Sequence, residues 1–453
     1  MQPLPKEFEE QMKRLLGEAG FFAYLDALNQ PYTRALRVNL LLRPDGTPPC
    51  PIEGLGAPVP WAKGAYFVEG DARPGLSPLH EGGLFYMQEP SALTAVTALD
   101  PQPGERVLDL CAAPGGKSTQ IAALMAGRGL LCCNEPIPSR AQILSRNIER
   151  MGVRNAVVLS AMPDALAPRF PAFFDRILVD APCSGEGMFR RQPEARDEWD
   201  ADAPRRCADR QMEILAQAAK MLRPGGTMVY STCTFNDTEN EGVLKRFLAL
   251  HPEFSLVPFA LPGLPEAKDG YLHLYPHEMR GEGHFVSRLK KADGADGADA
   301  PVQAAPQRKA PARAAAKGKA PAPIALPDVF SDAFAPERLY TAGDALWMLP
   351  EGISIEQLSG LRVLRTGLLL AHAEGKRSEP DHALAMALRP EEAARTASLT
   401  QTQALAYQAG ETLPLGDLPG GYTLLCCEGV SLGWGKQAGG LMKNHYPKGL
   451  RRR

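Results

Sequence analysis

Cys183 and Cys233 are the residues of this chain that most clearly suggest chemistry, because each follows a short apolar run typical of a buried strand. The runs are Arg-Ile-Leu-Val-Asp-Ala-Pro-Cys183 and Met-Val-Tyr-Ser-Thr-Cys233. A third run ends at Asp109 and breaks into Leu-Cys-Ala-Ala-Pro-Gly-Gly-Lys. Open α/β sheets bind ligands where buried strands end in small residues and glycines. Three such ends, two of them carrying a thiol, predict a cofactor site with a sulfur nucleophile.

The glycine-containing loop after the third run is not a common nucleotide-binding motif. A P-loop would need glycine at the position of Cys111, and the G-x-G-x-x-G pattern does not fit either. Pro114 fixes the turn, and Gly115 and Gly116 allow the backbone to approach a ligand ahead of the next helix. Glu135 follows the next predicted strand, where an acid can accept hydrogen bonds from both ribose hydroxyls of a nucleoside.

These loops need a scaffold, and the pattern between residues 89 and 291 supplies one. Strand-like and helix-like segments alternate there, which predicts a parallel, doubly wound α/β sheet. The expected strands span residues 106–110, 129–133, 156–160, 176–179 and 227–230, and the expected helices span residues 91–99, 118–125, 139–151 and 205–221. A further helix is predicted at residues 5–29, with one face formed by Phe8, Met12, Leu15 and Leu16.

Composition limits the class of protein. A chain of 453 residues is too long for one core, so two to four domains are expected. The N-terminus carries acids rather than the apolar segment of a signal peptide, and no apolar run is long enough to span a membrane. The nine cysteines form no C-x-x-C pair, which argues against a zinc site. We therefore predict a cytoplasmic protein without a metal, and most of its cysteines should simply be buried.

Charge is distributed unevenly in the C-terminal part. Residues 292–327 are rich in Ala, Pro and cations, a composition that cannot bury enough apolar surface to order itself, and they are predicted to be a disordered linker. From Gly429 to Arg453 there are six Lys or Arg residues and no acid. Such a basic segment indicates a contact with nucleic acid. The alternative is a solvated end without a partner.

The motifs together resemble the Sun-type RNA (cytosine-5) methyltransferases. The resemblance rests, in order and spacing, on Arg37-Val-Asn39, Tyr86-Met-Gln-Glu-Pro-Ser91, Asp109-Leu-Cys-Ala-Ala-Pro-Gly-Gly-Lys-Ser118, Asp180-Ala-Pro-Cys-Ser-Gly185, Ser231-Thr-Cys-Thr234 and Gly283-His-Phe-Val-Ser-Arg288. The region from Gly433 onward resembles the RsmF branch of that family, which methylates small-subunit ribosomal RNA. This implies a Rossmann-like methyltransferase dependent on S-adenosylmethionine, with an N-terminal extension and a C-terminal PUA-like RNA-binding domain.

The resemblance also implies a division of the chain and a partner. The domains expected are an N-terminal RNA-binding extension at 1–83, the catalytic domain at 84–291, the linker at 292–327, an intermediate domain at 328–390 and the PUA-like domain at 391–453. The expected partner is ribosomal RNA or the small ribosomal subunit, bound by a monomer.

In such a family two thiols have separate tasks. A thiolate that adds to carbon 6 of cytosine activates carbon 5 toward a methyl donor, and a second group assists release of the adduct. By resemblance Cys233 is the nucleophile and Cys183 assists release, while Asp180 and Lys117 face the base. The residues implied to bind the cofactor are Asp109, Cys111, Ala112, Ala113, Pro114, Gly115, Gly116, Lys117, Glu135, Arg140, Asp164 and Asp180.

Three alternatives stay open at the level of sequence. DNA cytosine methyltransferases use a Pro-Cys nucleophile, so the roles of Cys183 and Cys233 could be exchanged. The RNA could be transfer RNA rather than ribosomal RNA. The chain could also be a ribosome-assembly factor that keeps the fold and binds RNA without turnover.

Overall fold

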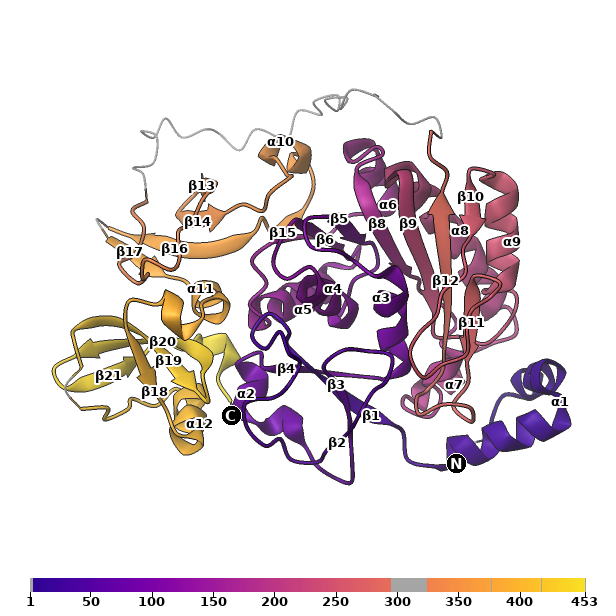
Figure 1. Cartoon of the computed structure of the whole chain (residues 1–453), viewed down its shortest axis with the longest axis horizontal. Coiled ribbons are helices and arrows are strands. Elements are labelled where there is room, and N and C mark those ends of the chain that lie inside the picture. Colours follow the sequence, from indigo (N-terminus) through magenta and orange to yellow (C-terminus); the bar gives the residue numbers. More distant parts are fainter. Residues whose placement is uncertain (1–2, 295–323, 376, 417, 453) are drawn as a thin grey trace.

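A nine-stranded sheet dominates the computed structural model, together with three sheets of four strands each (Figure 1). The structure describes residues 3–294, 324–375, 377–416 and 418–452. Most of the linker predicted at residues 292–327 lies outside these described residues. Within the described ranges, no helix has the length and apolarity needed to cross a membrane.

The nine-stranded sheet is parallel at its centre only. Its strands are β5 (Arg106–Asp109), β6 (Leu130–Asn134), β7 (Ala156–Leu159), β8 (Phe174–Asp180), β9 (Leu222–Thr232), β10 (Phe254–Leu256), β11 (Tyr271–Leu274), β12 (His284–Lys291) and β15 (Val363–Arg365). They follow the order β10-β12-β9-β8-β5-β6-β7-β15, with β11 beside β12. The strands from β9 to β7 are parallel, as predicted. The outer strands are antiparallel to their neighbours. Between β11 and β12 this is expected, because parallel neighbours need a crossover connection and no helix lies between these two strands.

Helices cover both faces of this sheet, which explains why the middle of each central strand is apolar. One apolar cluster contains side chains of α3 (Thr94–Leu99), α4 (Gly116–Leu124) and α5 (Pro138–Arg150). The other contains side chains of α6 (Pro163–Leu166), α8 (Ala203–Met221) and α9 (Glu241–Leu250). Every residue of β6 and β7 is buried between these layers. The doubly wound arrangement predicted from the sequence is therefore present.

The N-terminal part contributes a helix and a small sheet. Helix α1 (Lys6–Asn29) buries Phe8 and Met12, as predicted. Leu15, predicted on the same face, is instead 37% exposed, and the helix is interrupted two residues later at Gly17, whose φ is 69°. The sheet has the order β2-β3-β1-β4, and its elements are β1 (Arg34–Val38), β2 (Leu55–Pro58), β3 (Ala65–Val68), β4 (Phe85–Gln88) and the neighbouring α2 (Pro78–Glu81).

The C-terminal part contains two further sheets. The first has the order β13-β14-β16-β17 and comprises β13 (Leu339–Ala342), β14 (Ala345–Met348), β16 (Leu368–Glu374) and β17 (Arg377–Pro380). The second has the order β18-β19-β20-β21 and comprises β18 (Thr396–Ser398), β19 (Gly421–Cys427), β20 (Val430–Ala438) and β21 (Leu441–Asn444). The helices beside them are α10 (Ile355–Leu358), α11 (His382–Ala387) and α12 (Gln401–Ala409).

These C-terminal sheets are docked on the rest of the molecule (Figure 1). Strand β15 extends the central sheet by pairing with β7, and Arg365 Nη2 lies 2.5 Å from Glu149 Oε2 on α5. One apolar cluster joins side chains from residues 36–87 with side chains from residues 399–450. These contacts fix the C-terminal part to two other regions of the molecule.

The basic C-terminal segment belongs to this docked part and is not a solvated end. It forms β20 and β21, and its Trp434 is only 2% exposed. Arg452 donates hydrogen bonds to the carbonyl oxygens of Leu76 and Ser77, at 2.5 and 3.0 Å. The segment therefore contacts the N-terminal sheet region directly.

Candidate active site at the ends of the parallel strands

The loop between β5 and α4 is held in a tight turn. The Ala113–Pro114 peptide bond is cis, and Gly115 has a φ of 112°. A Cβ atom on Gly115 would lie 3.2 Å from Leu144 Cδ1 and 3.3 Å from Asn147 Cβ, so both backbone conformation and packing require glycine here. Asn147 Nδ2 donates a 2.9 Å hydrogen bond to the carbonyl oxygen of Pro114. Helix α5 thereby supports the turn from behind.

At the start of this loop, Asp109 is completely buried at the end of β5. Its Oδ2 accepts a 2.6 Å hydrogen bond from Ser118 Oγ, whereas its Oδ1 has no partner among the described residues. Burial raises the pKa of Asp109 to about 7, although the Ser118 hydrogen bond opposes the rise. Burial also raises the pKa of the Cys111 thiol, which favours an inert neutral group. The next backbone N–H, of Ala112, donates to the carbonyl oxygen of Asn134 at 2.8 Å.

Glu135 follows β6 and is 3% exposed. Its carboxylate accepts a 3.0 Å hydrogen bond from the backbone N–H of Ile137 and lies 3.4 Å from Arg140 Nη1. Arg140 also donates to the carbonyl oxygen of Ala113 at 3.2 Å, so it links this acid to the glycine turn. The structure thus brings Glu135 and Arg140 to the predicted cofactor loop. Asp164 is exposed in the first turn of α6, and no hydrogen bond or ion pair joins it to the loop within the described residues.

Residues of the N-terminal sheet brace the same loop from outside the central sheet. Arg37 is 1% exposed and donates to Thr119 Oγ1 at 2.8 Å and to the carbonyl oxygen of Gly116 at 3.2 Å. A Cβ atom on Gly116 would lie 3.3 Å from both Tyr86 Cε1 and Gln88 Cδ. The upstream motifs recognised in the sequence therefore help to shape the cofactor loop.

The two predicted thiols are in contact. Cys183 follows β8, Cys233 follows β9, and these parallel strands are neighbours with Asp180 opposite Ser231. Because parallel strands end at the same edge of a sheet, the loops that follow them meet there. The two Sγ atoms lie 3.3 Å apart, and both cysteines are partly exposed.

Asp180 lies at the centre of a charged cluster beside the thiols. Its Oδ2 is 2.8 Å from Lys117 Nζ, its Oδ1 accepts a 2.8 Å hydrogen bond from Ser231 Oγ, and His284 Nε2 is 3.5 Å away. Burial alone would raise the pKa of Asp180, but Lys117 and His284 outweigh burial and hold it well below its usual range. Asp180 is therefore a carboxylate that can accept hydrogen bonds.

Sequence reasoning missed Ser231 and His284 as neighbours of Asp180. The available signals were the position of Ser231 within the Ser-Thr-Cys-Thr motif and the position of His284 at the start of the last motif. Both motifs were recognised, but neither says which residue faces Asp180. For Ser231 that depends on the pairing of β9 with β8, and for His284 on the pairing of β12 with β9.

The surroundings of Cys183 disfavour its ionised form. The hydrogen bond with Cys233 and, next, burial raise the pKa of Cys183 well above its usual range. Cys183 is thus held as a neutral thiol next to Cys233. In the part of the chain that the structure describes, no group of three or more His, Cys, Asp and Glu side chains is arranged to hold a metal ion.

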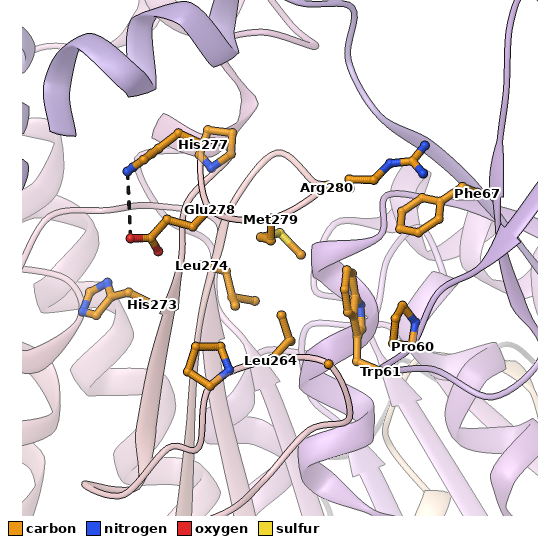
Figure 2. Close-up of a pocket in the computed structure, with 13 residues that line it drawn as sticks. Pro60, Trp61, Phe67, Leu264, His273, Leu274, His277, Glu278, Met279 and Arg280 are labelled. Carbon is orange, nitrogen blue, oxygen red and sulfur yellow. Dashed lines mark ion pairs between the residues drawn. The ribbon is translucent and has the colours of Figure 1, made fainter. Parts of the chain in front are cut away.

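A separate hollow of about 670 Å³ lies between the N-terminal sheet region and the segment before β12 (Figure 2). Trp61 and Phe67 line one side of it. Its charged groups are paired: Arg280 lies over the Phe67 ring at 3.9 Å and 2.9 Å from Glu69, and His277 lies 3.9 Å from Glu278. None of the residues that line this hollow belongs to the thiol loops or to the glycine loop. We therefore place the chemistry at the thiols and the glycine loop.

Comparison with known proteins identifies the family. The matching family models are the N-terminal domain of 16S rRNA methyltransferase RsmF at residues 4–90, 16S rRNA methyltransferase RsmB/F at 96–290, the RsmF first C-terminal domain at 327–388 and the RsmF PUA domain at 394–452. Ribosomal RNA small subunit methyltransferase F of Erwinia tasmaniensis is 34% identical, over 98% of this chain and 96% of its own length. The chain belongs to this methyltransferase F family. The Enterobacter sp. relative of the same name is 35% identical, over 98% and 95%.

Solved structures similar to this family member share its catalytic fold. A methyltransferase homologue from Pyrococcus horikoshii is 30% identical with a TM-score of 0.54, over 63% of this chain and 95% of its own. NSun6 from the same organism, solved with SFG, is 23% identical with a TM-score of 0.55, over 64% and 98%, and shows the fold alone. The predicted fold class and the prediction of an rRNA methyltransferase with a PUA RNA-binding domain are thereby confirmed.

Proposed function

We propose that this chain transfers the methyl group of S-adenosylmethionine to carbon 5 of cytosine in 16S ribosomal RNA, through a thiolate adduct at carbon 6. The observation that carries the proposal is the 3.3 Å contact of Cys183 and Cys233 beside the Asp180 carboxylate. Carbon 5 of cytosine is too weak a nucleophile to take a methyl group unaided. A thiolate at carbon 6 turns the ring into an enamine that is strong enough.

The residues around the glycine loop fit S-adenosylmethionine, which supplies an electrophilic methyl group when bound. The turn at Gly115 and Gly116 brings backbone close to a ligand, and the unpartnered Asp109 Oδ1 is a buried acceptor at the same loop. The Glu135 carboxylate has the position expected for an acceptor from two ribose hydroxyls. Arg140 holds that carboxylate toward the loop.

Cys233 is the proposed nucleophile. After the thiol has lost its proton to solvent, Sγ adds to carbon 6, and the displaced electron pair of the 5,6 double bond lets carbon 5 take the methyl group, with S-adenosylhomocysteine as the leaving group. Asp180, held as an anion by Lys117, accepts a hydrogen bond from the polar edge of the base and stabilises the positive charge that develops there.

Cys183 completes the cycle. After methyl transfer, carbon 5 carries a proton that must leave before the bond to Cys233 can break. The hydrogen bond with Cys233 is the main cause of the raised pKa of Cys183, and this cause disappears once Cys233 is bound to the base. Cys183 gives its own proton to solvent, and its thiolate then accepts the proton from carbon 5. The electron pair of that carbon–hydrogen bond restores the 5,6 double bond of the ring and expels Cys233 as a thiolate. The assignment of Cys233 as nucleophile and of Cys183 as the release group follows the resemblance of the Ser-Thr-Cys-Thr and Asp-Ala-Pro-Cys-Ser-Gly motifs to those of the family.

The match along nearly the whole chain to small-subunit methyltransferases supports ribosomal rather than transfer RNA as substrate. The presence of both thiols, Asp180 and Lys117 in one cluster supports turnover over a purely structural role in ribosome assembly.

The proposal is tested by replacing each thiol. Cys233→Ala should abolish 5-methylcytosine formation and covalent capture of RNA, because no adduct can form. Cys183→Ala should form an RNA-linked protein that migrates slowly on a denaturing gel, since release is blocked. Nucleoside mass spectrometry of 16S ribosomal RNA checks methylation, and Cys207→Ala, a half-buried cysteine on α8, is the control. Methylation by Cys233→Ala at the wild-type rate would overturn the proposal, and trapping by Cys233→Ala alone would exchange the two roles.

A further inference from the structure

Two buried carboxylates lie behind the thiols and were not singled out by any motif. Glu186 belongs to the loop that follows Cys183, and Glu239 belongs to the loop that follows Cys233. Both side chains are 0% exposed. An isolated carboxylate is costly to bury, so each must be compensated by hydrogen bonds. The identity of their donors shows what the carboxylates hold in place.

Glu239 binds the loop that carries Cys183. Its Oε2 accepts a 3.0 Å hydrogen bond from the backbone N–H of Ser184, the residue directly after this thiol. The same oxygen accepts from Gln211 Nε2 at 2.9 Å, and that amide also donates to the carbonyl oxygen of Pro182 at 3.0 Å. The backbone after Cys183 is thereby fixed directly to a residue of the other loop, and the backbone before Cys183 is fixed to the same residue through Gln211.

Glu186 binds the loop that carries Cys233. Its Oε2 accepts hydrogen bonds from the backbone N–H groups of Phe235 at 2.8 Å and Asn236 at 3.0 Å. Its Oε1 accepts from Gln11 Nε2 of α1 at 2.9 Å. Each carboxylate therefore holds the loop of the opposite thiol, and α1 supports one of them.

The amide of Asn236 joins the two carboxylates. Its Nδ2 lies 3.0 Å from Glu186 Oε1 and 2.8 Å from Glu239 Oε1, and the side chain is 1% exposed. Its Oδ1 accepts from the backbone N–H of Glu239 at 2.8 Å. We call Glu186, Asn236 and Glu239 the reciprocal clamp. Two loops that are remote in sequence are locked at one separation by this single group of side chains.

We propose that the reciprocal clamp positions the two thiols for catalysis, with Glu239 placing Cys183 for adduct release and Glu186 placing Cys233 for adduct formation. This inference rests on the proposed function. The carboxylates do not face the base, so they are positioning residues rather than catalytic ones. The crossed pattern fixes the two thiol loops relative to each other.

Substitution of each carboxylate by its amide separates the two tasks. In Glu239→Gln, the N–H donors of Ser184 and Gln211 lose their charged acceptor, Cys183 shifts, and adduct release slows. A displacement on the order of 1 Å lowers kcat by about 100-fold, while the KM for RNA should change less than about twofold. RNA-linked protein should accumulate, as in Cys183→Ala. Glu186→Gln should lower kcat similarly but leave less RNA-linked protein than wild type. In this variant the loop that carries Cys233 loses its charged acceptor, so adduct formation slows.

Controls distinguish positioning from damage to the fold. Glu213→Gln, an exposed glutamate on α8, should match wild type in every measurement. Unchanged melting temperature and S-adenosylmethionine affinity in the two clamp variants would show an intact fold. If Glu239→Gln does not fold, Gln211→Met keeps the carboxylate and removes its second donor, and should still accumulate adduct.

The outcomes separate this inference from the proposed function. Trapping by Cys183→Ala without trapping by Glu239→Gln or Gln211→Met would overturn the positioning role and leave the proposed chemistry intact. Equal losses of formation and release in both clamp variants would also overturn it. Absence of trapping in Cys183→Ala would instead refute the chemistry on which the inference depends.

Discussion

Asp109 and Asp180 end neighbouring parallel strands, yet their carboxyl groups have opposite pKa shifts. Asp180 gains Lys117 and His284 as cationic or donor partners, which outweigh burial. Asp109 is fully buried with one serine hydrogen bond, so burial prevails and raises its pKa to about 7. Residue type alone did not distinguish a carboxyl group held as an anion from one that titrates near neutrality; the partners did.

The raised pKa of Asp109 makes stability depend on pH. The folded pKa of about 7 exceeds the unfolded value near 3.8, so folding favours the protonated form, and stability falls as pH rises from about 4 to 7. Asp109→Asn cannot ionise and should lack this loss, gaining roughly 2–4 kcal/mol relative to wild type between pH 4 and pH 8. Urea denaturation at several pH values measures the difference. A constant gap between the two proteins would show that Asp109 does not titrate in this range.

Glu135 tests the cofactor site at the same scale. Glu135→Ala should weaken S-adenosylmethionine binding by roughly 1–3 kcal/mol, because ribose hydroxyls lose a charged acceptor. Isothermal titration calorimetry measures the affinity. Wild-type affinity in this variant would remove Glu135 from the site. Asp164→Ala tests the other predicted contact with the cofactor. Unchanged affinity for S-adenosylmethionine in this variant would remove Asp164 from the site.

Strand β15 belongs to the central sheet although it is remote from the other strands of that sheet in the sequence. It follows the predicted catalytic domain, which ends at residue 291, yet it pairs with β7 at the edge of the central sheet. An uncovered edge strand offers free N–H and C=O groups to other chains. Its Arg365 is 3% exposed and pairs with Glu149 on α5, so the added strand is also held by charge.

Removal of that charge should loosen the strand. Arg365→Met leaves the largely buried Glu149 carboxylate without its partner and should lower the free energy of unfolding by roughly 1–3 kcal/mol. The cost is smaller than for a fully buried carboxylate, because the Glu149 side chain is partly exposed. Arg246→Met removes an exposed pair with Asp209 and should change stability by less than about 0.5 kcal/mol. Urea titration compares the two. Equal effects would mean that the Arg365 pair contributes no more than a surface ion pair.

At the scale of the whole molecule, the catalytic and RNA-binding parts form one body. Side chains from residues 36–87 and 399–450 share an apolar cluster, and Gln408 Nε2 donates to the carbonyl oxygen of Pro78 at 3.0 Å. The N-terminal sheet that braces the glycine loop is therefore packed against the C-terminal sheet. RNA held by the C-terminal part would meet the thiols in a fixed geometry.

A chain that ends at Lys291 tests this connection. It keeps the thiols and the glycine loop but exposes the β7 edge and the apolar face that residues 399–450 cover. We expect its melting temperature to fall by more than about 5 °C and its tendency to aggregate to rise. Differential scanning fluorimetry and light scattering measure both. A monodisperse truncated protein with the full-length melting temperature would show that the docked contacts add nothing to stability.

The sequence alone determined those features of the site that depend on residues close together in the chain. Apolar runs that end in Asp109, Asp180 and Cys233 could be recognised as strands, because a strand buried on both faces needs continuous apolar residues. The alternation of strands and helices predicted the parallel centre of the sheet. Family motifs then gave Cys183 and Cys233 their predicted roles.

Tertiary structure decided what depends on residues far apart in the chain. The 3.3 Å thiol contact, the crossed hydrogen bonds of Glu186 and Glu239, and the addition of β15 all arise from side-by-side packing of remote segments. Glu239 lies in a short polar run that by itself suggests only a turn before a helix. Its importance depends on a donor 55 positions away. Local sequence cannot encode that partner, because hydrogen bonds and burial act through space.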